Sequence, residues 1–230
     1  MILDKEQINS ENQSNFDKHN QSFDFLANSL TNKGYDVEGL LKKICDFQVA
    51  IPSWALGAGG TRFGRFSYHG EPGTLEQKIE DVGLIHSLTQ SAGAISLHIP
   101  WDVPEDVQKI KALAKSLGLK FDAMNSNTFQ DQADQAQSYK YGSLTHTSEA
   151  VREQAIKHNI EVIELGKALG SKALTVWVGD GSNFPGQQHF RNSFSHYLDG
   201  AKTIYNALPK DWNMLLEHKM FEPAFYSTVI

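Results

Sequence analysis

The chain of 230 residues is 40% hydrophobic and 10% aromatic, which is enough apolar content to build one sizeable globular domain. Its 21 basic and 27 acidic residues leave a net charge of -6, which disfavours a protein that binds the phosphate backbone of nucleic acids. A lone Cys45 excludes an intramolecular disulfide, and no stretch approaches the ~20 apolar residues that a membrane helix needs. Since Met1–Ser10 also lacks a signal-peptide pattern, we expect a cytoplasmic protein that binds neither nucleic acid nor membrane.

The first 46 residues are expected to be helical. Residues 7–22 are polar and indicate a tail or a lead-in helix, whereas apolar residues between Phe23 and Ile44 recur at helical spacing. We expect the apolar side chains to pack against the outside of the domain that follows. The sequence is accordingly divided into an N-terminal helical extension, residues 1–46, and residues 47–230, which the strand pattern described below predicts to be the first five strands of a (β/α)8 barrel.

A glycine-rich segment follows the first predicted strand, residues 47–54. Its glycines match neither a Walker A loop nor a dinucleotide-binding fingerprint, and no helix starts directly after Gly64, which argues against a phosphate cradle. The segment from Gly57 to Gly73 also carries aromatic residues, among them Phe63. A lid over a binding site is the interpretation that we prefer for it.

The rest of the chain alternates helices with short apolar strands. Predicted helices begin at Thr74, Pro104, Ser148 and about Phe190, and predicted strands cover residues 94–102, 119–124, 173–178 and 213–219. Five strands separated by helices are typical of a parallel sheet built from βαβ units. Polar or aromatic residues end every strand, which favours a (β/α)8 barrel over a doubly wound sheet with one binding crevice. We therefore predict an α/β fold, a (β/α)8 TIM barrel that stops after about its fifth strand.

The last predicted strand ends in three ionisable residues. Because side chains alternate along a strand, Glu217 and Lys219 are expected on one face and His218 on the other. A carboxylate and an ammonium in one pocket suit a site for a metal and a sugar. The alternative is a solvated Glu/Lys pair at the end of a surface strand.

Taken together, four strand ends resemble L-rhamnose isomerase, in the group related to xylose isomerase. They are Trp54, His98-Ile99-Pro100-Trp101-Asp102, residues 175–181 and Glu217-His218-Lys219. The resemblance covers roughly residues 20–230 and implies a (β/α)8 barrel with a pair of divalent metal ions, usually Mn²⁺. It also implies interconversion of an aldose sugar with its ketose, by proton transfer or hydride shift, in a homotetramer.

The resemblance assigns roles to individual residues. It makes Glu217 a metal ligand and Lys219 a catalytic charge that stabilises the developing oxyanion, while His98 binds the sugar ring oxygen or helps to open the ring. Phe63 would reach the pocket of a neighbouring subunit. The apolar wall against the sugar would be formed by Trp54, Trp101 and Trp177.

Plainer interpretations exist for several of these residues. A single histidine on a strand, such as His98, is more often a satisfied core residue than a catalytic one, and tryptophans at strand ends can simply fill a barrel mouth. Asp102 and Asp180 can be turn or helix caps.

The other metal ligands of the resembled group fall on later strands, beyond residue 230. One carboxylate holds a divalent ion weakly, so the 230-residue polypeptide alone is expected to be inactive. A sugar epimerase or a metal-dependent hydrolase on the same type of barrel, and a non-catalytic fragment, are the alternatives.

Overall fold

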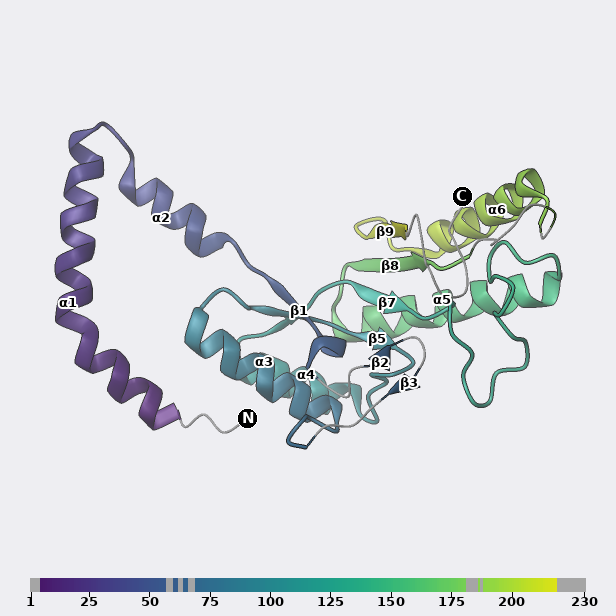
Figure 1. Ribbon diagram of the computed structural model, residues 1–230, viewed down its shortest axis with the longest axis horizontal. Coiled ribbons are helices and arrows are strands. Elements are labelled where there is room, and N and C mark those ends of the chain that lie inside the picture. Colours follow the sequence, from purple (N-terminus) through teal and green to yellow (C-terminus); the bar gives the residue numbers. More distant parts are fainter. Residues whose placement is uncertain are drawn as a thin grey trace.

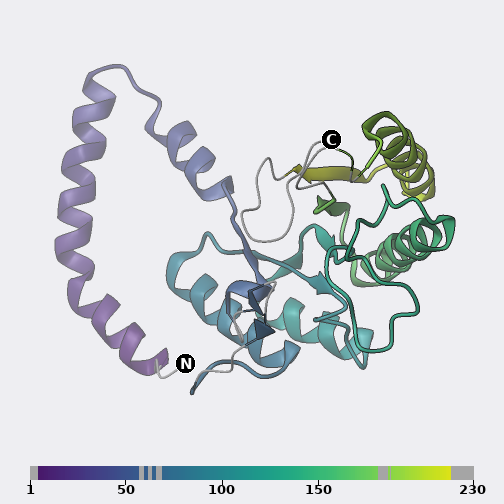
Figure 2. The same cartoon turned by 45° about the vertical axis from the view of Figure 1, so that its right-hand side comes forward.

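The computed structural model describes residues 5–56, 60–61, 64–65, 69–180, 186 and 188–218. In Figure 1 two helices at the N-terminus stand apart from a body that holds the strands and the other helices, and the turned view in Figure 2 agrees. The helices are α1 (Lys5–Asn32), α2 (Val37–Asp46), α3 (Leu75–Thr89), α4 (Val107–Ser116), α5 (Glu149–Leu169) and α6 (Phe190–Ala207), with a 3-10 turn, η1, at Ser53–Ala55. The strands are β1 (Ala50–Pro52), β2 (Gly60–Thr61), β3 (Gly64–Arg65), β4 (Ala94–Ser96), β5 (His98–Ile99), β6 (Lys120–Phe121), β7 (Met124–Ser126), β8 (Ala173–Val178) and β9 (Asn213–His218).

Two sets of parallel strands form the body. One runs in the order β1-β4-β6 and the other in the order β5-β7-β8-β9, while β2 and β3 make a separate antiparallel pair. Backbone bonds continue across the breaks, since Asp122 donates to Ile95 at 2.9 Å and Asn125 donates to Leu97 at 2.8 Å. The predicted second and third strands are therefore each one strand with a short interruption. Strands lie side by side in chain order, as expected for successive parallel βαβ units.

One face of these strands is covered by helices. α3, α4, α5 and α6 pack against one another in chain order, with α3 on β4 and α5 on β7 and β8. The strand residues beneath them are fully or almost fully buried and join the helices in one core, which includes Ile95, Leu97, Met124, Leu174, Val176, Ile163 and Ile204. Since side chains alternate along a strand, Thr175 and Trp177 of β8 point to the opposite face. That face is the one that the helices leave free.

Helix ends follow the predicted signals at Thr74 and Gly170 and depart from them at Pro104 and Ser148. α4 begins at Val107 and not at Pro104, because the Asp106 side chain accepts the first free N–H groups of the helix. Thr74 and Gln77 form the predicted capping box at the start of α3, and Gly170 ends α5 with a φ of 93°. The prediction that the Ser148 hydroxyl caps α5 is wrong, because that side chain makes no capping bond. His146 Nδ1 accepts the backbone N–H of Ser148 at 2.9 Å, a bond to the residue before the helix and not to its first turn.

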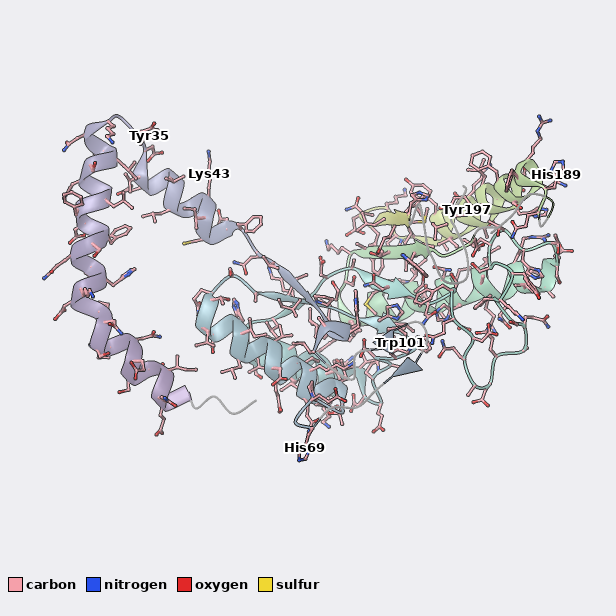
Figure 3. The ribbon with its side chains drawn as sticks, in the orientation of Figure 1. Tyr35, Lys43, His69, Trp101, His189 and Tyr197 are labelled. Carbon is pink, nitrogen blue, oxygen red and sulfur yellow. The ribbon has the colours of Figure 1, made fainter. Side chains whose placement is uncertain are left out.

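The first two helices form an arm, α1 and α2, that extends away from the body. The prediction that their apolar side chains pack on the outside of the domain is wrong for the described residues: α2 has no buried residue, and Phe25 and Ile44 are 79% and 61% exposed. Figure 3 shows Tyr35 and Lys43 on this arm, far from Trp101 in the body. The arm rejoins the body where Val49 donates to Ser91 at 2.7 Å. The first strand is also shorter than predicted, at Ala50–Pro52.

A partly buried histidine on α5 makes folding stability depend on pH. The Nε2–H of His158 donates to the carbonyl of Ile99 at 3.2 Å, and burial lowers the pKa of the imidazole below its ordinary value. The unfolded chain therefore binds a proton more readily than the folded chain as the pH falls through about 6.5. We expect the free energy of unfolding to be highest above that pH and to decrease below it, until the pH passes the lower pKa of the folded state.

Urea unfolding of the protein at pH 5.5 and 7.5 measures this dependence. His158→Gln should flatten the difference between the two pH values, because the titrating group is gone. His19→Gln, on the exposed face of α1, is the matched control and should leave the difference unchanged. An equally steep pH dependence in His158→Gln would contradict the assignment.

Candidate functional site

The four predicted aromatic and imidazole side chains meet in one cluster. The His98 ring stacks on Trp101 at 3.9 Å between centroids, with an angle of 16° between the ring planes, and Trp54 meets it edge-on at 5.4 Å. Phe129 connects this group to Trp177, at 5.8 Å from His98 and 4.1 Å from Trp177. We call these five side chains the aromatic wall. Contacts of this kind between rings add about 0.5–1.5 kcal/mol per pair beyond simple burial.

Phe129 is the member that sequence reasoning missed. It follows Asn127-Thr128, directly after β7, in the long connection to α5. The signal was present, because every other member of the wall also sits at or just after the end of a strand. A polar strand end followed by one aromatic residue is weak evidence by itself, and the ring contacts supply what the sequence lacked.

Strand register places the wall on the face that the helices leave free. His98 is paired with Asn125, and Asn125 with Thr175, so the three share one face of the parallel strands. Trp177, two residues beyond Thr175, lies on the same face and one step nearer to the carboxyl ends. Ligands of parallel α/β folds bind at those ends.

Glu217 of β9 is the register partner of Trp177 of β8, so its carboxylate lies on the same face of the strands as the wall. His218 pairs with Val178 and points to the other face, as the alternation predicts. Leu215 and Leu216 are 48% and 40% exposed, so both faces of β9 are open among the described residues.

Two predicted site residues, Lys219 and Phe63, lie outside the described residues, as do parts of the predicted lid from Gly57 to Gly73. Their assignments stay predictions.

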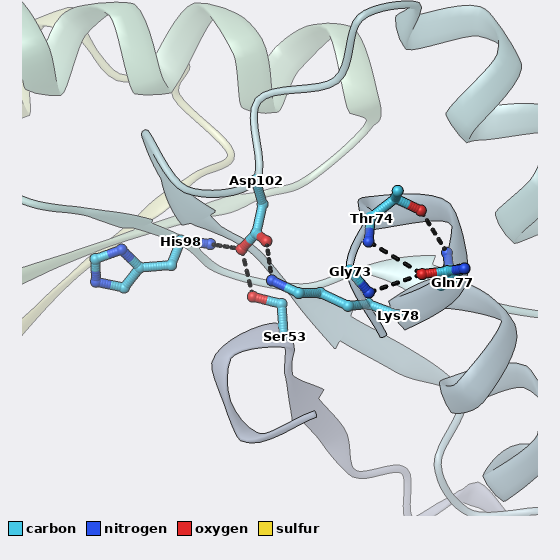
Figure 4. Close-up of polar contacts among 7 residues, drawn as sticks. All are labelled: Ser53, Gly73, Thr74, Gln77, Lys78, His98 and Asp102. Carbon is cyan, nitrogen blue, oxygen red and sulfur yellow. Dashed lines mark hydrogen bonds and ion pairs between the residues drawn. The ribbon is translucent and has the colours of Figure 1, made fainter. Parts of the chain in front are cut away.

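Asp102 lies just after β5 and connects several segments there. The sequence alone left it as a possible turn or helix cap. Its carboxylate is 2% exposed and accepts hydrogen bonds from the Ser53 hydroxyl, from Lys78 Nζ at 2.6 Å and from the His98 backbone N–H at 2.8 Å (Figure 4). The backbone N–H of Asp102 donates in turn to the His98 carbonyl at 2.9 Å. Three separate segments are thus tied together around one buried charge.

Asp180 has a similar function at the end of β8. It is 4% exposed and accepts from the backbone N–H and hydroxyl groups of both Ser143 and Thr145, at 2.7–2.9 Å. These bonds hold the connection between β7 and α5 against the carboxyl end of β8. Burial, together with the negative charge of Asp180, raises the pKa of the neighbouring Tyr197 hydroxyl to about 12.

The predicted metal site needs several donor side chains close together. No cluster of three or more His, Cys, Asp or Glu side chains suited to a metal ion occurs in the described part of the chain. Glu217 offers one hard oxygen ligand, of the type that Mn²⁺ and Mg²⁺ prefer, but about six ligands are normal for such ions. The described residues therefore do not make a complete metal site.

Two cavities lined by described residues lie away from the aromatic wall. A cavity of about 750 Å³ lies at the amino ends of the strands, beside Lys120, Ala173 and Asn213, and one of about 500 Å³ lies beside α5, near Gln154 and His158. The wall is the better candidate site, since its side chains converge on the free face at the carboxyl ends.

Sequence comparison connects the chain with sugar isomerases. It is 52% identical over 230 residues to a probable sugar isomerase of Rhizobium meliloti, covering all of this chain and 54% of that protein. A probable sugar isomerase of Mesorhizobium japonicum is 55% identical over 205 residues, which are 89% of this chain and 47% of that protein. The chain is thus similar to proteins named as sugar isomerases, and it spans about half of their length.

More distant matches agree on the broad class. The xylose isomerase of Thermus thermophilus is 28% identical over 115 residues, 46% of this chain and 28% of that protein. No protein-family model matches. L-rhamnose isomerase is a narrower expectation than these names support.

Structure comparison supports the fold. D-allulose 3-epimerase from Methylomonas sp. superposes with a TM-score of 0.52 at 14% identity, covering 79% of this chain and 53% of that one. The 3-keto-D-glucoside 4-epimerase from E. coli gives 0.52 at 12% identity, covering 71% and 56%. The parallel α/β fold of the chain is therefore one that sugar epimerases share. Among the described helices, none has the length and apolar content to cross a membrane.

Proposed function

We propose that this chain is the first part of a sugar isomerase built on a (β/α)8 barrel, which converts an aldose into its ketose. The observation that carries the proposal is the aromatic wall on the free face of strands wound in chain order, with Glu217 in register beside it. Aromatic faces suit the C–H face of a sugar, and His98 and Glu217 supply polar groups at the same strand ends. The similarity to proteins named as sugar isomerases supports the same class.

In this proposal each residue has a distinct function. Trp54, Trp101 and Trp177 pack against the sugar and keep water from its reacting carbons. His98 hydrogen-bonds the ring oxygen and helps to open the ring, and Lys219 stabilises the negative charge that develops on the sugar oxygen. L-rhamnose is the first substrate to test, because the methyl group of this 6-deoxy sugar suits an apolar wall.

Glu217 is proposed as one ligand of a divalent metal centre, with Mn²⁺ the first ion to test. When bound, such an ion would polarise the carbonyl and hydroxyl oxygens of the sugar. The remaining ligands, the three further strands of the barrel and the contacts of a homotetramer would come from outside the described residues. Among the described residues β9 pairs with β8 alone, which leaves its other edge for a further strand.

Conversion of L-rhamnose by the full-length protein with Mn²⁺, followed by chromatography of the ketose, tests the function. A ketose that is converted instead into its C3 epimer, with no aldose formed, would favour the second candidate, a sugar epimerase, which the structural likeness to two epimerases supports. The 230-residue polypeptide alone is expected to be inactive, since it offers one of the proposed metal ligands. Turnover by that polypeptide would contradict the assignment of the missing ligands.

Glu217→Gln should weaken Mn²⁺ binding by about tenfold or more, because the variant removes an anionic ligand and keeps the side-chain shape. Isothermal titration of the full-length protein with MnCl₂ measures this without any need for turnover. Glu164→Gln, an exposed carboxylate on α5, is the matched control and should bind Mn²⁺ as the wild type does. Unchanged affinity in Glu217→Gln would remove this residue from the metal site.

A further inference from the structure

Lys78 lies on α3, distant in sequence from the predicted site residues. Its ammonium group nevertheless contacts the carboxylate of Asp102, beside the aromatic wall. Its ammonium is 2.6 Å from Asp102 Oδ1, and the two side chains are 12% and 1% exposed. An ion pair this well shielded from water differs from an exposed one, because removal of one partner leaves the other charge buried and uncompensated. Figure 4 shows Lys78 reaching Asp102 from the side of α3, beside Ser53.

The groups that bond to Asp102 are the neighbours of the wall in the chain. Ser53 precedes Trp54, Trp101 precedes Asp102, and the third donor is the backbone N–H of His98 itself. The two ring contacts of His98 with Trp54 and Trp101 are therefore made by side chains whose backbones meet around this carboxylate. A shift of the carboxylate would move all three rings relative to one another.

Lys78 is itself held in place by the start of α3. Gln77, the preceding residue, closes the capping box with Thr74 and accepts the backbone N–H of Gly73 at 2.7 Å. The first turn of the helix is thus fixed at the point where the glycine-rich segment ends (Figure 4). The Lys78 ammonium therefore reaches Asp102 from a fixed turn of a helix. Binding sites are positioned precisely when their supporting residues lie on rigid elements.

We propose that Lys78 is a positioning residue for the sugar site, which acts through Asp102 to set the relative placement of Trp54, His98 and Trp101. The inference rests on the proposed function for its effect on sugar binding. Its structural part, the placement of the rings, does not depend on which reaction the protein catalyses. A misplaced wall weakens binding of the sugar and impairs orientation, since small displacements in a site have large effects on rate.

A second lysine provides a matched control. Lys109 of α4 pairs with Glu76 of α3 at 2.9 Å, so it also connects to α3, but its side chain is 65% exposed and that of Glu76 is 34% exposed. Exposed pairs of this kind contribute little. Lys78→Met and Lys109→Met remove the same charge from a buried and from an exposed pair, while Lys78→Arg keeps the charge.

The test combines kinetics with a spectroscopic measurement on the full-length protein. We expect Lys78→Met to raise KM for L-rhamnose about tenfold, Lys78→Arg to recover most of the loss, and Lys109→Met to behave as the wild type. In protein labelled with 5-fluorotryptophan, Lys78→Met should shift the ¹⁹F resonances of Trp54 and Trp101. The resonance of Trp212, which packs against Gly166 of α5, should stay in place.

The contrary result is a lower melting temperature in Lys78→Met with unchanged KM and unchanged Trp54 and Trp101 resonances, which would make Lys78 a purely structural cation. If Lys78→Met does not fold, the double variant Lys78→Met/Asp102→Asn removes both charges and keeps an amide oxygen for Ser53 and His98. It should still show the shifted resonances and raised KM, and wild-type values would overturn the inference. A wild-type protein inactive on sugars would contradict the proposed function, and the ¹⁹F shifts would then decide the inference alone.

Discussion

Replacement of His98 by asparagine is expected to lower kcat/KM for the sugar by about 100-fold or more, which is the usual contribution of a positioned acid or base. The imidazole is held flat against Trp101 at 3.9 Å and faces Trp54 and Phe129, so its ring edge has a defined direction. Asparagine retains a polar group but loses the ring, the stacking and the ability to exchange a proton near neutral pH.

Steady-state kinetics of the full-length protein, with the circular dichroism spectrum as a check on folding, measures this effect. Trp101→Phe is the control that keeps an aromatic face beside His98, and its loss should be much smaller. If His98→Asn retained wild-type kcat/KM, His98 would be a packing residue of the barrel mouth, as the plainer interpretation of the sequence has it.

The Asp180→Ala variant should lose about 3 kcal/mol or more of folding stability, because four buried hydrogen-bond donors of Ser143 and Thr145 lose a charged acceptor. Asp180→Asn keeps one acceptor oxygen and should lose less. Unfolding in urea, followed by circular dichroism, gives both values. Asp199→Ala, on the exposed side of α6, should stay within about 0.5 kcal/mol of the wild type. An equally small loss in Asp180→Ala would show that the connection before α5 is held by other contacts.

The strands and most helices could be predicted because local sequence determines them. Buried parallel strands such as β8 are short apolar runs, and the capping box of Thr74 and Gln77 is a signal within four residues. The interruptions at Leu97 and at residues 122–123 could not be predicted, since they depend on how neighbouring strands meet. The prediction that α1 and α2 pack against the domain was wrong. An apolar stripe shows that a helix has a face suited to packing, but it does not show which surface that face contacts.

The candidate site was predictable to the same degree. The sequence could predict that Trp54, His98, Trp101 and Trp177 lie together, because each stands at the end of a strand, where parallel folds bring residues together. Their functions toward a ligand stay predictions. Lys78 was missed because its partner is 24 residues away on another element, and nothing near it in the sequence marks it. From the sequence, Asp102 and Asp180 could be no more than turn or helix caps. The donors that surround each carboxylate come from distant segments, and the local sequence does not show them.

The open faces of β9 have a practical consequence for anyone who handles these 230 residues as a separate polypeptide. Within the described residues β9 pairs with β8 alone and β1 with β4 alone, so each has a row of unpaired backbone donors and acceptors along one edge. On β9 that edge runs beside the exposed Leu215 and Leu216, which is the combination that lets strands of different molecules pair. The apparent molar mass of the separate polypeptide, measured by light scattering, should therefore rise with concentration. A short peptide that adds a strand to the β9 edge should suppress this rise.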